Sequence, residues 1–171
     1  MTPEQAQYYL VMLKLGESEE YDRALDRLLE EQEPLSDLVL ELAFCMSDRR
    51  QTISVLHNFL LDHPADQLIL CDAFLKGLRQ RYQSGAMTAL QVSEYLYSLI
   101  VANDWEEPWA DLYKYCDLHE VYEEGLISRA VFEQCFEAAF LREEMLNHWE
   151  LQETENAQKG LLGKLRDLLH K

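Results

Sequence analysis

The chain has 171 residues and a formal net charge of −17, from 32 acidic and 15 basic residues. Apolar residues make up 48% of the chain, which excludes a disordered acidic tail and indicates a folded domain with a negative surface. The same charge argues against nucleic acid as a ligand, because polyphosphates are bound mainly by Lys and Arg, and it favours a basic protein or peptide.

Apolar residues recur at intervals of three and four rather than two, which predicts an all-α fold. Thr2-Pro3 opens the first helix and Gly16 ends it, while Thr88 and Ser128 begin two later helices as N-caps. The other predicted helices cover residues 18–33, 36–46, 48–62, 65–83, 106–123 and 157–170. We therefore expect about eight or nine helices, packed as antiparallel helix pairs.

Residues 34–44 and 64–74 share the pattern P-x-x-[DQ]-L-[VI]-L-x-x-A-F, and a fainter copy starts at Pro108. A helix precedes and follows each proline, as in helical-repeat proteins. Reuse of a good helix start by chance explains the pattern equally well. The sequence therefore leaves open a compact helical array and a short helical-repeat superhelix.

The charge changes sign at the C-terminal end. We expect residues 1–155 to form an acidic all-helical domain and residues 156–171 a short basic amphipathic helix. In the predicted helix the basic residues outnumber the single acid, Asp167, and its leucines form a stripe. Such a helix can bind a membrane surface or a partner groove. Because the rest of the chain would repel an anionic membrane, we expect the helix to dock on the same domain.

The cysteines are far apart, and each lies in an apolar helical run: Cys45, Cys71, Cys116 and Cys135. This spacing predicts buried, reduced thiols rather than a disulfide framework, which is typical of a reducing compartment. The start of the chain lacks the features of a signal peptide, and no apolar run is long enough for a membrane span. We therefore expect a cytoplasmic protein.

No catalytic or cofactor motif stands out. The chain lacks G-x-S-x-G, G-x-G-x-x-G and the phosphate-binding loop pattern, and no histidine has a glutamate three residues before it. Cys116 and His119 have the spacing of two zinc ligands, but no second pair matches them. We expect no metal, no cofactor and no enzymatic activity, and a metal- or carboxylate-dependent enzyme in a helical bundle is the least favoured alternative.

Residues 103–124 hold two of the three tryptophans and three of the nine tyrosines, with eight carboxylates and one lysine between 104 and 124. Aromatic rings stack on guanidinium groups and carboxylates pair with them, so this composition suits an arginine-rich partner. Spacing by four would place Trp105, Trp109 and Tyr113 on one side of a helix. For Trp109, Leu112, Tyr113 and Cys116 we favour the alternative that they form the core stripe of that helix. The residues that we predict to bind a partner are Trp105, Glu106, Glu107, Asp111, Glu120, Glu123 and Glu124.

These features predict a non-enzymatic protein-binding domain. One example is an acidic immunity or inhibitor-type protein that captures a basic partner such as a toxin or a nuclease. The alternative is a helical-repeat scaffold that binds a peptide or a helix in a groove. The acidic helix at 18–33 is a second candidate patch, and the sequence leaves open whether the chain forms a homodimer.

Overall fold

The computed structural model describes residues 1–31, 33–45 and 48–169. Over these residues the chain forms nine α-helices and one 3-10 helix, η1, with no strand, which confirms the all-α prediction. In chain order the helices are α1 (Pro3–Leu15), α2 (Glu19–Glu31), α3 (Asp37–Cys45), α4 (Arg49–Asp62), α5 (Gln67–Gln83), α6 (Ala89–Ala102), η1 (Trp109–Tyr115), α7 (Asp117–Glu123), α8 (Arg129–Arg142) and α9 (His148–Leu169).

The chain divides into two compact units. Unit 1 comprises Met1–Lys76 and Ser98–Ala110, and unit 2 comprises Gly77–Tyr97 and Asp111–Lys171. Both α5 and α6 contribute residues to each unit. Among the described helices, none is long and apolar enough to cross a membrane.

The helix starts follow the predicted caps. The Thr2 hydroxyl accepts a hydrogen bond from the Gln5 amide, and the Gln5 side chain accepts one from the Thr2 amide, which completes a capping box. Thr88 and Gln91 repeat this arrangement at the start of α6. Gly16 ends α1 with φ of 94°, a left-handed conformation that glycine adopts without steric cost.

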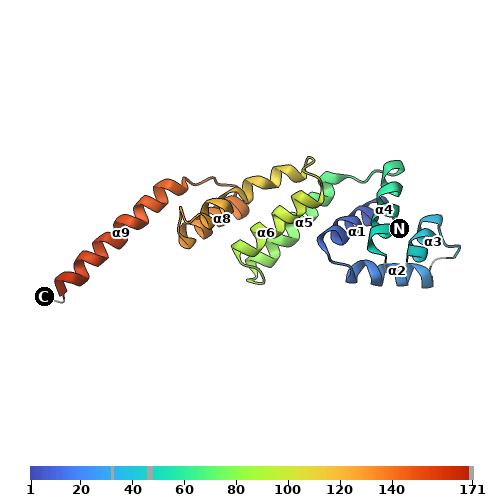
Figure 1. Cartoon of the computed structure of the whole chain (residues 1–171), viewed down its shortest axis with the longest axis horizontal. Coiled ribbons are helices and arrows are strands. Elements are labelled where there is room, and N and C mark those ends of the chain that lie inside the picture. The colour runs from blue at the N-terminus through green and yellow to red at the C-terminus, as the bar shows by residue number, and fades with distance from the viewer. Residues whose placement is uncertain (32, 46–47, 170–171) are drawn as a thin grey trace. The chain divides into compact units, whose positions relative to one another are not determined.

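Unit 1 is built around the first four helices. α1 packs against α2 and α4, and α3 packs against α2 and α4 (Figure 1). Consecutive helices are therefore in contact, and the most extensive contact, between α1 and α4, joins the first and last helices of this group. The helices bury one apolar stripe each, as the three-and-four spacing predicts. The buried cluster contains Ala6, Leu10, Leu13, Tyr21, Leu25, Val39, Leu42 and Leu56.

Unit 2 has an aromatic core on α8. Phe132, Phe136 and Phe140 recur every four residues and are at most 1% exposed, so they share the buried face of this helix. The Tyr82 ring lies edge-on to Phe136, with ring centroids 5.5 Å apart, and Tyr115 lies edge-on to Phe140 at the same distance. Edge-to-face contacts add to the stability gained from burial of the rings.

α9 begins at His148, not at residue 157 as predicted, because Asn147 provides an N-cap whose side-chain oxygen accepts hydrogen bonds from the amides of Trp149 and Glu150. Residues 148–156 are mostly polar, so the spacing of apolar residues did not indicate that the helix starts there. Most of the predicted leucine stripe (Leu161, Leu165, Leu168 and Leu169) lies outside the described side chains, and Leu162 is 66% exposed.

The first turns of α9 hold the N-terminus of α8. The Gln152 side-chain oxygen accepts a hydrogen bond from the Ser128 amide at 2.6 Å, and the Glu155 carboxylate accepts one from the Ser128 hydroxyl. Lys159 pairs with Glu155 at 2.8 Å. These two partners, Lys159 first, lower the pKa of the Glu155 carboxyl group. Ser128 therefore links α8 and α9 while its hydroxyl also caps α8.

Replacing Ser128 with alanine should lower the free energy of unfolding by about 1–2 kcal/mol, because it removes the cap of α8 and the contact with Glu155. Urea unfolding followed by circular dichroism measures this change. Ser54→Ala, at an exposed position within α4, serves as the control and should have little effect. Equal stability of the Ser128 variant and the wild type would contradict the role of this residue.

The two copies of the proline-containing pattern mark the starts of α3 and α5, but equivalent positions differ in burial. Val39 is fully buried, whereas Ile69, at the equivalent position, is 64% exposed. Phe44 is 81% exposed, whereas the ring of Phe74 stacks on Tyr8 with centroids 5.4 Å apart. The pattern therefore reflects a shared way to start a helix rather than one repeated packing unit.

Candidate partner-binding site

The site is built on the segment that follows α6. The Asn103 side-chain amide donates to the carbonyl oxygen of Leu99 at 2.8 Å and closes the last turn of the helix. Asp104 and Trp105 then take φ angles of 57° and 60°, in the left-handed region. This conformation costs L-residues roughly 1–2 kcal/mol each, so the surrounding contacts must hold this turn in place.

The prediction of a helix at residues 106–123 is wrong at its start and its middle. The residue before a proline is disfavoured in helical conformation, so Pro108 prevents a start at Glu106. The chain instead forms the 3-10 helix η1 and then α7, with Cys116 between them. Trp105 lies in the turn and does not share a helix face with Trp109.

A pocket of about 270 Å³ opens on unit 1 beside this turn. Its lining comes from four parts of the chain: α1, α4, the start of α5 and the segment after α6. The lining residues are Gln7, Leu10, Lys14, His57, Leu60, Leu61, Gln67, Asn103, Asp104, Glu106, Glu107 and Trp109.

Trp109 is the most deeply buried of the residues that line the pocket. Its side chain is 1% exposed, and its indole N–H donates a hydrogen bond to the Gln67 side-chain oxygen at 3.0 Å. The ring of Phe74 lies edge-on to it, with centroids 5.7 Å apart. The prediction that Trp109 belongs to the core is therefore correct, and the same residue shapes the pocket.

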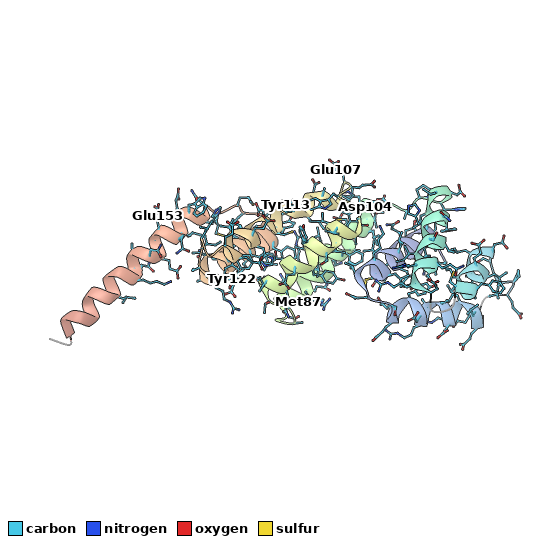
Figure 2. The ribbon with its side chains drawn as sticks, in the orientation of Figure 1. Met87, Asp104, Glu107, Tyr113, Tyr122 and Glu153 are labelled. Carbon is cyan, nitrogen blue, oxygen red and sulfur yellow. The ribbon has the colours of Figure 1, made fainter. Side chains whose placement is uncertain are left out.

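The charged groups of the pocket are unevenly paired. The Lys14 ammonium group donates to the carbonyl oxygen of Ala102 at 2.6 Å and pairs with Asp104 at 3.2 Å. Glu106 and Glu107 are exposed, and neither forms an ion pair with any residue in the described ranges. Figure 2 shows Asp104 and Glu107 on the segment after α6. The rim thus carries three carboxylates against one lysine.

Gln7 contributes a polar group from inside unit 1. The residue is 9% exposed and lines the pocket. Within residues 1–31, 33–45 and 48–169, no hydrogen bond engages its side-chain amide. Among the described residues, the fully buried side-chain polar atoms without a hydrogen-bond partner belong to Tyr21, Ser93 and His119. The Gln7 amide therefore reaches solvent in the pocket and is available to hydrogen-bond a ligand there.

The structure brings together three of the seven residues predicted from the sequence. Glu106 and Glu107 line the pocket, and Trp105, which is 47% exposed, immediately precedes them. The other four belong to unit 2: Asp111, Glu120, Glu123 and Glu124.

Two of those four carboxylates have partners within unit 2. Glu120 accepts a hydrogen bond from the Tyr113 hydroxyl at 3.4 Å, and Glu123 lies 3.4 Å from the His119 ring nitrogen. These contacts already occupy part of the hydrogen-bonding capacity of the Glu120 and Glu123 carboxylates. We therefore centre the candidate site on the pocket of unit 1.

Sequence reasoning did not identify the residues that α1, α4 and α5 contribute to the pocket. Gln7, His57 and Gln67 are single polar residues within helical segments, and each has ordinary neighbours in the sequence. Only the packing of helices that are distant in the chain brings them to one place, so no local pattern indicates them.

Burial raises the pKa of the thiols of Cys45, Cys116 and Cys135, so none of these three cysteines is an activated nucleophile. All four cysteines are buried and free of disulfides, as their spacing predicts. Burial raises the pKa of the Cys116 thiol to about 12, so it stays protonated at neutral pH. Among the described residues, no group of three His, Cys, Asp or Glu side chains is placed to hold a metal ion.

Fold and site together define an all-α protein with an acid-rimmed pocket beside a tryptophan-containing turn. Comparisons with protein-family models, with curated proteins and with solved structures find no match.

Proposed function

We propose that this chain is a non-enzymatic protein-binding domain that captures a basic partner at the pocket of unit 1. The observation that carries the proposal is the pair Glu106 and Glu107, two carboxylates without cation partners in the described structure at the rim of a partly apolar pocket. Carboxylates without a cation partner at the rim of a pocket stabilise a complex when a cationic side chain pairs with them.

Capture would proceed in two stages. The net charge of −17 attracts a basic protein over distances of about a Debye length, roughly 10 Å at 0.1 M salt, and so raises the association rate. A cationic side chain then pairs with the rim carboxylates, while the exposed ring of Trp105 lies next to them in the chain. Trp and Arg are common anchors of protein interfaces.

A partner that acts through a cationic surface would lose its activity when that surface is covered. Toxins and nucleases that bind phosphate groups with Lys and Arg belong to this class. An immunity or inhibitor-type role follows from this reasoning, since the captured cations are the groups that such a partner needs.

The proposal is tested by affinity capture from lysate of the source cells at low salt, with elution by rising salt and mass spectrometry. Three baits are compared: the wild type, the double variant E106Q/E107Q, and the control D26N/E30Q, which removes the same charge from the exposed face of α2. We expect one basic protein on the wild type and the control, and its loss from E106Q/E107Q. Equal loss from both variants would show that net charge, not the site, retains the protein.

The alternative, a scaffold that binds a peptide or helix in a groove, has one observation in its favour. Phe44, Leu68 and Ile69 on α3 and α5 are 81%, 60% and 64% exposed. Exposed apolar side chains on helices are common anchors for a partner helix. If the double variant F44S/I69S lost the partner while E106Q/E107Q retained it, this alternative would replace the acidic pocket.

A further inference from the structure

We infer that the pocket of unit 1 accepts the side chain of a single arginine from the partner protein; this inference rests on the proposed function. Its basis is the combination of pocket size, the unpartnered amide of Gln7 and the acceptors that Lys14 leaves free. Each of these observations restricts which side chain of a partner could bind in the pocket.

The size of the pocket suits one side chain. Pockets that enclose drug-sized ligands span about 300–1,000 Å³, and this pocket has a volume of about 270 Å³. Leu10, Leu60 and Leu61 provide apolar wall, and the carboxylates lie on the adjacent loop. This combination of apolar wall and acidic rim suits a long side chain with a methylene stem and a charged end. The stem can pack on the leucines while the charged end pairs with the carboxylates.

The Gln7 amide favours a group with several donors. Its oxygen can accept one N–H, and the nearby rim can accept others at the same time. A guanidinium group carries five N–H donors in one plane, so it can bond an amide oxygen and a carboxylate together. An ammonium group is a compact and strongly hydrated point charge, which makes it a poorer match for spread acceptors.

Lys14 already uses the acceptors that suit an ammonium group. Its Nζ atom bonds the Ala102 carbonyl oxygen and the Asp104 carboxylate. The acceptors that remain include the Gln7 oxygen and the carboxylates of Glu106 and Glu107. A second ammonium would also lie near the positive charge of Lys14, whereas a guanidinium spreads its charge over a larger group. We therefore expect the pocket to prefer arginine over lysine.

The test uses blocked amino acids as probes of a side chain within a protein. N-acetyl-arginine amide and N-acetyl-lysine amide are titrated into ¹⁵N-labelled full-length protein at low salt, and the Trp109 indole N–H and the Gln7 side-chain amide are followed by NMR. We expect the arginine probe to shift both resonances with a Kd about tenfold lower than that of the lysine probe. Free arginine, whose carboxylate the acidic rim repels, should bind more weakly than the blocked form.

Two variants separate insertion from surface attraction. Gln7→Leu replaces the amide with an apolar side chain of similar size, so the protein should stay folded, and it should raise the Kd of the arginine probe about tenfold. Asp26→Asn on α2 should leave this Kd nearly unchanged. A well-dispersed NMR spectrum of the Gln7 variant confirms that it is folded.

The outcomes also separate this inference from the proposed function. Equal Kd values for the arginine and lysine probes, or no effect of Gln7→Leu, would overturn arginine insertion. If the captured partner still depended on Glu106 and Glu107 in that case, capture at the rim would stand. Tighter binding of free arginine than of the blocked form would overturn the inference in favour of a small-molecule ligand.

Discussion

Replacing Trp109 with alanine will lower the free energy of unfolding by about 3–5 kcal/mol and abolish binding at the pocket. The side chain is 1% exposed, and it contacts Phe74 and donates to Gln67. Truncation removes this burial, leaves a large cavity and leaves the Gln67 oxygen without its donor. Urea unfolding followed by circular dichroism measures the loss of stability.

Two further variants make the Trp109 result specific. Trp149→Ala removes a tryptophan that is 50% exposed and should cost less than about 1 kcal/mol. Trp109→Phe keeps most of the buried ring but loses the indole N–H, so it should cost about 1–3 kcal/mol. A Trp109→Ala variant as stable as the Trp149→Ala variant would contradict the structure of unit 1.

The double variant E106Q/E107Q will weaken binding of the captured partner about 10- to 100-fold at low salt. Both carboxylates line the pocket and have no cation partner in the described structure, so no neighbouring cation offsets their attraction for an incoming one. Part of the effect should appear as slower association, because removal of rim charges weakens steering. Surface plasmon resonance at several salt concentrations measures both rate constants.

A charge-matched control shows whether the weaker binding comes from the two rim carboxylates or from the lower net charge. D26N/E30Q changes the net charge by the same amount on the exposed face of α2. We expect it to slow association slightly and to leave the dissociation rate unchanged. If both double variants weakened binding equally at every salt concentration, the acidic surface would act only through its net charge.

The helical fold was predictable because it depends on local patterns. The capping boxes at Thr2 and Thr88 and the cap at Ser128 lie where the sequence places them. The start of α9 was missed because its first residues are polar and only Asn147 marks the N-cap. The predicted helix at 106–123 was too long, because the prediction gave more weight to the spacing of apolar residues than to the helix-breaking effect of Pro108.

The candidate site was predictable only in part, for a physical reason. Acidic and aromatic residues close together in the chain are visible in the sequence, and Glu106 and Glu107 were found in this way. The pocket needs Gln7 from α1 and Gln67 from α5, which tertiary packing alone brings to the same place. The division into two units, which separates Glu107 from Glu120, also depends on contacts that no local pattern encodes.

The most direct test of the account is hydrogen–deuterium exchange of the full chain with and without its captured partner. We predict slower exchange in peptides that cover residues 7–14, 57–67 and 101–112, since these segments line the pocket and its rim. Protection confined to α2, or to α8 and α9, with unchanged exchange at residues 101–112, would contradict capture at this site.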